Sequence, residues 1–231
     1  MAQKGAVVGR PEFVTSFADY RRKFGGYLSE NTHGDFRFLP YAIEQFFANG
    51  GARCYVMRVA PADAKCALTS MGSIVATAKN PGKWGNDIKI TAVTASKAKS
   101  QIVEAIEDMA TNAKVYKAKN ASGFAVGDTV SLLENGNVVA YNKIAKIADN
   151  IITFEKDFET DIVDKNAVPK RILATCELNI VVSCEDIVEQ FELVSFNTAD
   201  SSFIDNRLSK STLIDIKSTK IDDIFPPMLA L

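Results

Sequence analysis

The sequence predicts an α/β main domain, of the α+β kind, that is interrupted by a small antiparallel β module, either a barrel or a sandwich. Two amphipathic helical patterns near the N-terminus and apolar strand patterns beside them indicate the α/β part. From about residue 113 the chain consists of short alternating runs separated by turn signals, which is typical of a small β fold. Strand and helix patterns then return. We therefore assign 1–112 and 171–231 to one discontinuous domain and 113–170 to an inserted β domain.

The composition is that of an ordinary globular protein. The chain has 231 residues, of which 47% are hydrophobic and 24% are charged, so it can bury a core without disulfides or metals. No apolar run approaches the ~18 residues of a membrane-spanning helix, and no signal peptide opens the chain. We therefore expect synthesis in the cytoplasm and no insertion into a membrane.

Charge is unevenly distributed along the chain. The net charge of −1 gives no electrostatic argument for nucleic-acid binding. Residues 1–60 hold eight Lys and Arg against five Asp and Glu, a balance of +3, whereas residues 176–231 hold four against ten, a balance of −6. This asymmetry fits two solvated faces, and it also fits a subunit whose ends attract neighbouring copies in a polymer.

The first helix is predicted at 16–24. Thr15 and Ser16 can both cap this helix, Asp19 lies three residues after Ser16, and aromatic side chains follow at helical spacing. The glycine pair that comes next ends the helix, because glycine readily takes the left-handed conformation of a helix C-terminus. The stretches "GAVVG" and "EFVT" before the helix predict short strands.

The second helix is predicted at 39–48, where apolar residues recur at helical spacing and Pro40 stands near the start. The pair Gly50-Gly51 ends it. The next stretch, "RCYVMRVA", is apolar on both faces except at its arginines, which predicts a central strand covered by helices. A phosphate-binding turn would need glycines between a strand and the start of a helix, and here the order is reversed.

The residue pattern changes in the middle of the chain. Strands are predicted at "SIVATA" and "DIKITAVTA", on either side of the loop "KNPGKWGN", and a helical linker is predicted at 96–114. Within the β module, Asn135-Gly136 and Asp149-Asn150 predict hairpin turns.

The last part of the chain returns to the α/β pattern. "ELNIVVS" and "VEQFELVSF" predict a hairpin of two strands, and "STLIDIK" predicts another strand. Between them, Ser201 or Ser202 can cap a short helix that contains Phe203 and Leu208.

Residues that could carry catalysis or bind metal do not form a complete motif. His33 is the only histidine, and Asp35 lies two residues away, but no serine or cysteine is tied to the pair by sequence, which favours a solvated loop histidine. The cysteines lack the spacing of zinc ligands, and we expect them to be reduced thiols, mostly buried. The four are Cys54, Cys66, Cys176 and Cys184.

The pair Gly82-Lys83 does not complete a phosphate-binding loop, because that motif needs a glycine at position 77 and Ser or Thr after the lysine. Thr77 and Trp84 occupy those places, and we expect Trp84 to anchor a tight turn. We predict no catalytic, cofactor-binding or metal residues. Charged residues without an assigned role are Asp87, Asp186, Glu189 and Glu192, which form no acid/base pair by sequence, and Arg53 and Arg58, which either meet carboxylates of a neighbour or are solvated.

Three blocks in this order, "FVTSFADYRRKFGGY", "LPYAIEQFFANGGARCYVMRVAP" and "NPGKWGNDIKI", resemble the tail sheath proteins of contractile phages and related injection machines. The family has a segment of type F-x-N-G-G-x-x-C-Y-V-x-R-V, here Phe47 to Val59, and a loop of type P-G-x-W-G-N-D, here Pro81 to Asp87. The return segment at 176–231 is similar as well, and 113–170 resembles the inserted β domains that vary between sheath proteins.

The resemblance implies a structural subunit, not an enzyme, that needs no cofactor. Such subunits stack as rings in a helix around an inner tube and shorten when a baseplate triggers them. The implied partners are other sheath subunits, the inner tail tube and the baseplate, with no direct contact to nucleic acid. The implied location is a virion tail or contractile particle assembled in the bacterial cytoplasm.

Sheath proteins usually begin with an extended N-terminal arm and continue past a P-x-x-L-x-L segment, which here ends at Leu231, into a C-terminal domain with a further arm. We therefore expect this chain to be a fragment that lacks both arms. Without strands to exchange with neighbours, we expect it to stay monomeric or weakly associated in dilute solution.

Two other classes of function stay open on the residues alone. A small-molecule-binding or enzymatic α/β domain would need a cleft with perturbed titratable groups. A receptor- or glycan-binding module would show exposed aromatic side chains on one face of 113–170, with Phe124, Tyr141 and Phe158 as candidates.

Overall fold

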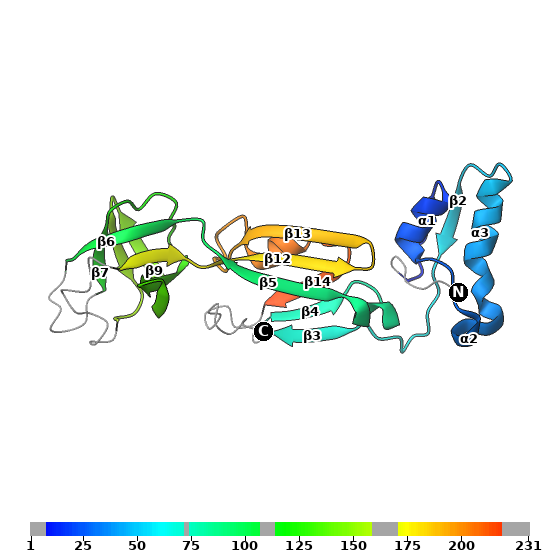
Figure 1. Ribbon diagram of the computed structural model, residues 1–231, viewed down its shortest axis with the longest axis horizontal. Coiled ribbons are helices and arrows are strands. Elements are labelled where there is room, and N and C mark those ends of the chain that lie inside the picture. Colours follow the sequence, from blue (N-terminus) through cyan, green and yellow to red (C-terminus); the bar gives the residue numbers. More distant parts are fainter. Residues whose placement is uncertain (1–7, 72–73, 107–113, 159–170, 219–231) are drawn as a thin grey trace. The chain divides into compact units, whose positions relative to one another are not determined.

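The computed structural model describes residues 8–71, 74–106, 114–158 and 171–218 (Figure 1). These residues form a mixed α/β structure in which most of the regular structure is strand, arranged in several antiparallel sheets.

The chain divides into two compact units, each of which is described by itself. Unit 1 consists of Met1–Thr69, Ala76–Ile88 and Thr212–Asp215. Unit 2 consists of Ser70–Val75, Lys89–Ser211 and Ile216–Leu231.

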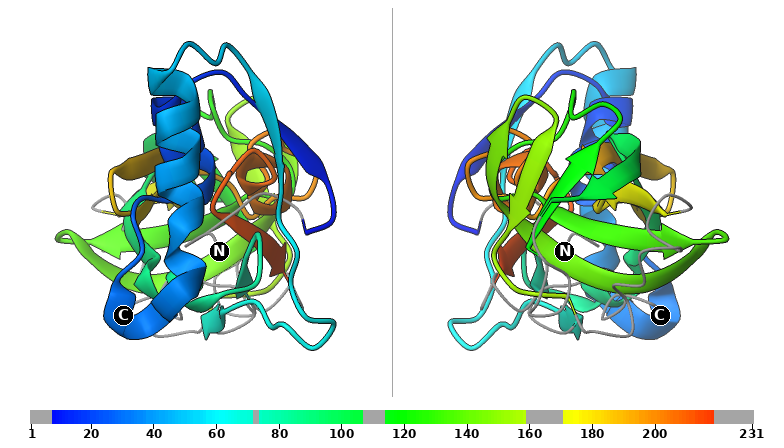
Figure 2. Two further views of the ribbon diagram at one scale, coloured as in Figure 1. Left: turned by 90° about the vertical axis from the view of Figure 1, so that its right-hand side faces the viewer. Right: turned by 90° about the vertical axis from the view of Figure 1, so that its left-hand side faces the viewer.

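The first part of unit 1 combines a two-stranded antiparallel sheet with short helices. α1 and α3 lie side by side (Figures 1 and 2), and their apolar side chains pack with the inward-facing residues of both strands around Val14, Tyr20, Phe24 and Val56. The elements are β1 (Pro11–Val14), α1 (Phe17–Phe24), α2 (Glu30–His33), the 3-10 helix η1 (Gly34–Phe38), α3 (Leu39–Ala48) and β2 (Cys54–Met57).

The predicted first helix is confirmed, together with its cap. The Ser16 hydroxyl accepts a hydrogen bond from the Asp19 backbone N–H at 3.0 Å, and the Asp19 carboxylate accepts one from the Thr15 N–H at 3.3 Å. The Asp19 N–H, which the helix itself leaves unpaired, is thus satisfied, and the Asp19 side chain also holds the residue before the cap. Gly25 closes the helix at a φ of 89°, in the region that glycine adopts without strain.

The second predicted helix is confirmed as well, and its glycine pair has the expected structural role. Gly50 has a φ of 91°, and a Cβ at Gly51 would lie 2.4 Å from the Phe46 ring. Gly50 therefore supplies a backbone conformation that favours glycine, and a side chain at Gly51 would require the exposed Phe46 ring to move.

The prediction that the following strand is covered on both faces is wrong for the described part of the chain. β2 pairs with β1, and the two helices pack on one face of this sheet. On the other face Tyr55 is 71% exposed. Both faces of β2 are therefore apolar, and folding of the described residues covers one of them.

The loop before β5 packs tightly, as predicted from Trp84. This side chain is only 6% exposed, and a Cβ at Gly85 would lie within 3 Å of the Ala67 and Ala78 side chains. The elements around the loop are the 3-10 helix η2 (Lys83–Asp87) and a three-stranded sheet of order β14-β4-β3, formed by β3 (Leu68–Met71), β4 (Ile74–Ala78) and β14 (Ile214–Ser218).

Unit 2 contains a three-stranded antiparallel sheet of order β13-β12-β5. The predicted hairpin is confirmed by β12 (Glu177–Cys184) and β13 (Ile187–Val194), whose turn places Glu185 at a φ of 52°. β5 (Lys89–Ala95) pairs with the other edge of β12. The predicted short helix is α4 (Ile204–Leu208), but it follows Phe203 without a side-chain cap, so neither serine caps it.

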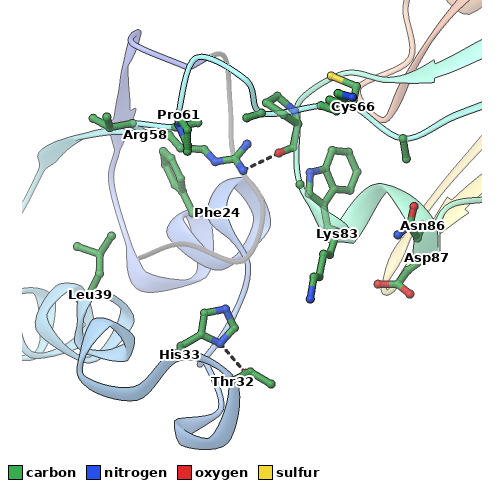
Figure 3. Close-up of a pocket in the computed structure, with 18 of the residues that line it drawn as sticks. Phe24, Thr32, His33, Leu39, Arg58, Pro61, Cys66, Lys83, Asn86 and Asp87 are labelled. Atoms are coloured by element: carbon green, nitrogen blue, oxygen red, sulfur yellow. Dashed lines mark hydrogen bonds between the residues drawn. The ribbon is translucent and has the colours of Figure 1, made fainter.

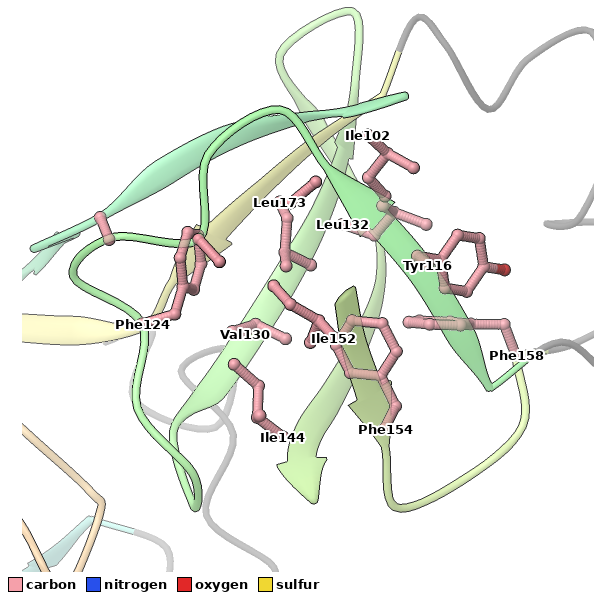
Figure 4. Packing of buried hydrophobic residues seen from close by; sticks show 13 residues of the cluster. Ile102, Tyr116, Phe124, Val130, Leu132, Ile144, Ile152, Phe154, Phe158 and Leu173 are labelled. Atoms are coloured by element: carbon pink, nitrogen blue, oxygen red, sulfur yellow. The ribbon is translucent and has the colours of Figure 1, made fainter. Parts of the chain in front are cut away.

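The other part of unit 2 is a closed six-stranded barrel of order β10-β7-β6-β11-β8-β9. Its interior is filled by apolar side chains from all six strands, and Tyr116, Phe154 and Phe158 pack with ring centroids 5.1 to 5.8 Å apart (Figure 4). The strands are β6 (Lys99–Ala105), β7 (Val115–Ala118), β8 (Thr129–Glu134), β9 (Asn137–Ala148), β10 (Ile151–Phe154) and β11 (Ile172–Thr175).

Both predicted hairpin turns are confirmed in this barrel. Asn135 and Gly136 have φ values of 51° and 84°, and they join β8 to β9. Asp149, at a φ of 52°, begins the turn from β9 to β10. Positive φ at such positions is what selects Asn, Asp and Gly in two-residue turns.

The helical linker predicted at 96–114 is wrong, because β6 runs through it. Ser100 and Ile102 are buried while Lys99 and Gln101 are exposed, which is the two-residue period of a strand and not the period of a helix. The six strands therefore extend from 99 to 175, so the barrel is wider than the range 113–170 and takes one strand from each flank.

Candidate functional site

One face of the β1–β2 sheet is apolar and exposed. Phe13 lies opposite Tyr55 in the strand register, and Pro11 lies opposite Met57. The rings of Phe13 and Tyr55 pack with centroids 5.3 Å apart, yet Phe13, Tyr55 and Met57 are 40%, 71% and 51% exposed. Clusters of exposed aromatic and apolar side chains of this kind mark surfaces for interaction.

The edges of this sheet are also open within the described residues. β1 pairs there with β2 alone, so each strand has one edge whose backbone groups face no further strand. An open edge can accept an added strand from another chain through main-chain hydrogen bonds. The apolar face and the open edges together form a surface that can support assembly.

Unit 1 also holds a large cavity of about 1070 Å³. Its walls come from the helical part and from the loop that carries Trp84, and Phe24, Leu39 and Pro81 contribute apolar surface (Figure 3). The charged and titratable side chains that line it are His33, Arg58, Lys65, Cys66, Lys83 and Asp87.

Arg58 is held at the wall of this cavity by a backbone contact. Its Nη2 donates to the Pro81 carbonyl oxygen at 2.5 Å, while its Nη1 is buried with no hydrogen-bond partner among the described residues. Burial lowers the pKa of this guanidinium. From the sequence this arginine either meets a carboxylate or is solvated, but the partner seen here is a carbonyl oxygen, which leaves the positive charge uncompensated by that bond.

His33 and Asp35 do not form a catalytic pair. The His33 Nδ1 lies 2.6 Å from the Thr32 hydroxyl, at the end of α2, and the Asp35 side chain is fully exposed with the Arg37 guanidinium 4.0 Å away. The histidine lines the cavity (Figure 3) and the aspartate points into solvent.

The four cysteines all lie in the described part of the chain, and none of them forms a disulfide there. Cys54 and Cys66 are half-buried, and Cys176 and Cys184 are buried. Burial raises the pKa of Cys176 to about 12, so this thiol stays protonated and unreactive at neutral pH. Over the residues that the structure describes, no group of three or more His, Cys, Asp or Glu side chains is placed to hold a metal ion.

The remaining charged candidates stay scattered. Asp87 lines the cavity of unit 1, and Glu189 accepts a hydrogen bond from the Ser211 hydroxyl at 2.5 Å. Asp186 lies in the turn between β12 and β13, and Glu192 and Arg53 are exposed on their strands or beside them. These carboxylates are not brought together as an acid/base pair.

A buried ionic cluster in unit 2 has no counterpart in the sequence predictions. The Lys97 Nζ lies 2.7 Å from an Asp200 oxygen, 3.1 Å from Asp128 and 3.8 Å from Glu177. The side chains of Asp128 and Glu177 are only 1% and 2% exposed. The Asn197 side chain and the Ala125 backbone N–H each donate a hydrogen bond to Asp128 at 2.8 Å.

The cluster perturbs its own members. Burial disfavours the charge of Lys97, but hydrogen bonds to Asp200 and Asp128 outweigh it and raise the pKa of Lys97. The bond from Lys97 lowers the pKa of Asp200, whereas burial raises the pKa of Glu177 in spite of that carboxylate's own hydrogen bonds. The cluster ties the β5–β6 connection to the turn before β8 and to the loop after β13, so its role is to hold unit 2 together.

The barrel does not present the aromatic face that a glycan-binding surface would need at the three candidate positions. Phe124 and Phe158 are buried in the barrel core, at 8% and 4% exposure, and Tyr141 is half-buried. Two of these rings therefore serve packing (Figure 4).

Comparison with known proteins assigns no family to the chain. No family model matches it, and a search of curated proteins finds no relative. Within the described part, no helix is long and apolar enough to cross a bilayer.

Proposed function

We propose that this chain is a structural subunit of a contractile tail sheath, which polymerises around an inner tube and shortens to drive that tube through a cell envelope. The observation that carries the proposal is the exposed apolar face of the β1–β2 sheet. It lies inside the sequence blocks that resemble sheath proteins, from "FVTSFADY" to "RCYVMRV".

Those blocks contain two kinds of apolar residue, and folding explains only one of them. Val14, Tyr20 and Phe24 fill the core beneath the sheet. Tyr55 and Met57 alternate with the buried Val56 and face outward. Apolar side chains that a fold leaves in water favour association, because association removes them from water.

The open strand edges support the same function. Strand addition between neighbours joins subunits through main-chain hydrogen bonds and holds a polymer together without any ligand. β1 and β2 are four residues each, which is short enough to limit uncontrolled pairing in the free subunit.

We also propose that the barrel is an inserted domain of the sheath subunit. β5 and β12 are neighbours in one antiparallel sheet, and Ala95 pairs with Glu177. The chain leaves this sheet after Ala95, forms the six-stranded barrel and returns at Glu177. An excursion between two paired strand ends is the pattern that a domain insertion leaves.

The partners proposed for the subunit are further copies of itself, the inner tail tube and the baseplate. The proposed location is the tail of a virion or a related contractile particle, assembled in the bacterial cytoplasm. The work of contraction would come from interfaces between subunits, so the function requires neither cofactor nor enzymatic step.

Immunogold electron microscopy of particles released by the native producer tests this function. Antibodies raised against the chain should label striated tails at regular intervals along their whole length, in the extended and the contracted state. Labelling of a single point, such as a fibre tip, would favour a receptor-binding role instead. Unlabelled tails in a culture that makes the protein would contradict the proposal.

A further inference from the structure

The cavity of unit 1 has a chemical character that the packing of unit 1 does not require. Its charged lining is Arg58, Lys65 and Lys83 against Asp87, a balance of +2 when His33 is neutral. Apolar surface from Phe24 and the nearly buried Trp84 lies beside these charges. A positive and partly aromatic cavity of about 1070 Å³ is large enough to take several side chains of a ligand.

We propose that this cavity binds an acidic and apolar peptide segment from a second copy of the chain, namely the segment around residues 221–228. The inference deepens the proposed sheath function, on which it rests, by naming one contact between subunits. The occupant is a peptide because the cavity offers both a carboxylate site and apolar walls, whereas a free anion would use the charges alone.

The carboxylate site is formed by Arg58 and Lys83. The Pro81 carbonyl holds one guanidinium nitrogen of Arg58 in place, and the other nitrogen, Nη1, is buried without a partner among the described residues. Because Nη1 is covered in the free chain, the guanidinium would have to turn toward the cavity, where a carboxylate would satisfy this donor with a charge-assisted hydrogen bond. Lys83, on the loop that carries Trp84, and His33, at the end of α2, line the same cavity (Figure 3).

The segment 221–228 has the matching chemistry. It reads IDDIFPPM, with two aspartates followed by isoleucine, phenylalanine and two prolines. Its charge of −2 complements the lining, and the prolines restrict its backbone before binding, which lowers the entropy lost on association. These residues lie outside the described part, and their sequence alone enters this comparison.

The choice of a second copy follows from the same asymmetry on a larger scale. Residues 1–60, which supply much of the cavity wall, carry a balance of +3, and residues 176–231 carry −6. Opposite charges on the two ends of a chain steer one copy toward the next. In a polymer of identical subunits, one such contact per subunit repeats along the whole assembly.

The fluorescence of Trp84 provides a direct assay, because it is the only tryptophan of the chain and it lines the cavity. The titrated probe is a synthetic peptide of residues 219–228, which contains no tryptophan. The acceptor is the whole chain with Asp222→Asn and Asp223→Asn, so that its own segment does not compete. We expect a saturable change in Trp84 emission that weakens when the salt concentration is raised.

Variants separate a specific site from general attraction. Arg58→Gln should weaken peptide binding about tenfold or more, because the carboxylate loses its buried donor, and tenfold corresponds to about 1.4 kcal/mol. Lys83→Gln, at an exposed position, should weaken it about two- to fivefold. Lys89→Gln is the matched control: it removes the same charge from an exposed lysine outside the lining, and binding should not change. A peptide with both aspartates replaced by asparagine should not bind.

Equal weakening by Lys83→Gln and Lys89→Gln, or no saturable signal, would overturn the inference. A different result would overturn it as well. If Asp222→Asn changes the Trp84 emission of the chain, and this emission does not depend on chain concentration in the wild type, then the segment binds within its own copy. If the peptide does not bind but the antibodies label tails along their whole length, this contact is refuted and the proposed sheath function is not.

Discussion

Replacing Lys97 by methionine should strongly destabilise unit 2, because Lys97 is the cation of a buried ionic cluster. Its Nζ lies within 4 Å of Asp128, Glu177 and Asp200. Methionine keeps much of the apolar stem and removes only the charge and its hydrogen bonds. Asp128 and Glu177, at 1% and 2% side-chain exposure, would then be buried without their cation.

The magnitude follows from that burial. Breaking a buried ion pair by removing one partner costs about 3–5 kcal/mol, and the 21% exposure of the Lys97 side chain places the expected loss near the lower end. A loss of about 3 kcal/mol is a large fraction of the 5–15 kcal/mol, roughly, by which domains of this kind are stable. The matched control is Lys99→Met, two residues away at an exposed position of β6, which should cost less than about 0.5 kcal/mol.

The effect should depend on pH in a definite direction. In the wild-type chain the lowered pKa of Asp200 gives stability that is present above its unfolded pKa and is lost as the pH falls through its folded pKa. The raised pKa of Glu177 acts in the opposite sense, so the ionisation of this carboxylate costs stability as the pH rises. Without Lys97, which favours the charged form of Glu177, this carboxylate is harder to ionise, and the variant should lose most stability at pH 7 and less near pH 4.5.

Urea unfolding followed by circular dichroism at pH 7 and at pH 4.5 measures both quantities. The expected result is a lower midpoint for Lys97→Met at pH 7, and a smaller difference from the wild type at the lower pH. A loss below about 1 kcal/mol, or the same loss at both pH values, would show that water reaches the cluster and that the carboxylates do not depend on Lys97. An equal loss in Lys99→Met would refute the reasoning as well.

Three further predictions address other parts of the chain. Ser16→Ala removes the N-cap of α1 and should cost about 1 kcal/mol in thermal or urea unfolding, whereas Ser16→Asp should restore most of that loss. Tyr55→Ser with Met57→Ser removes exposed apolar surface and should reduce the weak association that light scattering detects at high protein concentration, while leaving the melting temperature nearly unchanged. A clear drop in melting temperature would mean that these side chains support the fold. Replacing 96–176 by Asn-Gly joins the paired ends of β5 and β12 as a hairpin, and the shortened protein should still unfold cooperatively. Replacing only 113–170 leaves β6 and β11 without the rest of their barrel, and this protein should aggregate. Equal behaviour of the two deletions would contradict the observed barrel boundaries.

Elements set by neighbouring residues were predictable from the sequence. The cap of α1 joins Ser16 to Asp19, three residues apart, and the turn at Asn135 and Gly136 is decided by the φ values of two adjacent residues. Such signals lie within a few positions of each other, so they can be read without the fold. The hairpin of β12 and β13 was predictable for the same reason.

Elements set by distant residues were not predictable. The contacts of Lys97 join residues 31, 80 and 103 positions apart, and nothing near Lys97 in the sequence indicates them. The mixed, polar residues of β6 favour a helical linker when the sequence is taken alone. Its strand conformation depends on pairing with β7 and β11, which brings Ile102 into a core built by the other strands.

The error at β2 carries information about assembly. Its sequence predicts cover on both faces, and the described residues cover one. Fully burying a large apolar side chain contributes about 1.5–3 kcal/mol, and Phe13, Tyr55 and Met57 are on average about half exposed, with the values given above. Covering them would therefore contribute roughly 3 kcal/mol, which is less than the roughly 4–15 kcal/mol that association loses in translational and rotational freedom. This face alone cannot hold two subunits together in dilute solution.

A stable polymer needs further contacts that form at the same time, for which the open strand edges and the basic cavity of unit 1 are the available surfaces. Removing any one of them should weaken assembly without abolishing it, and removing two should prevent it.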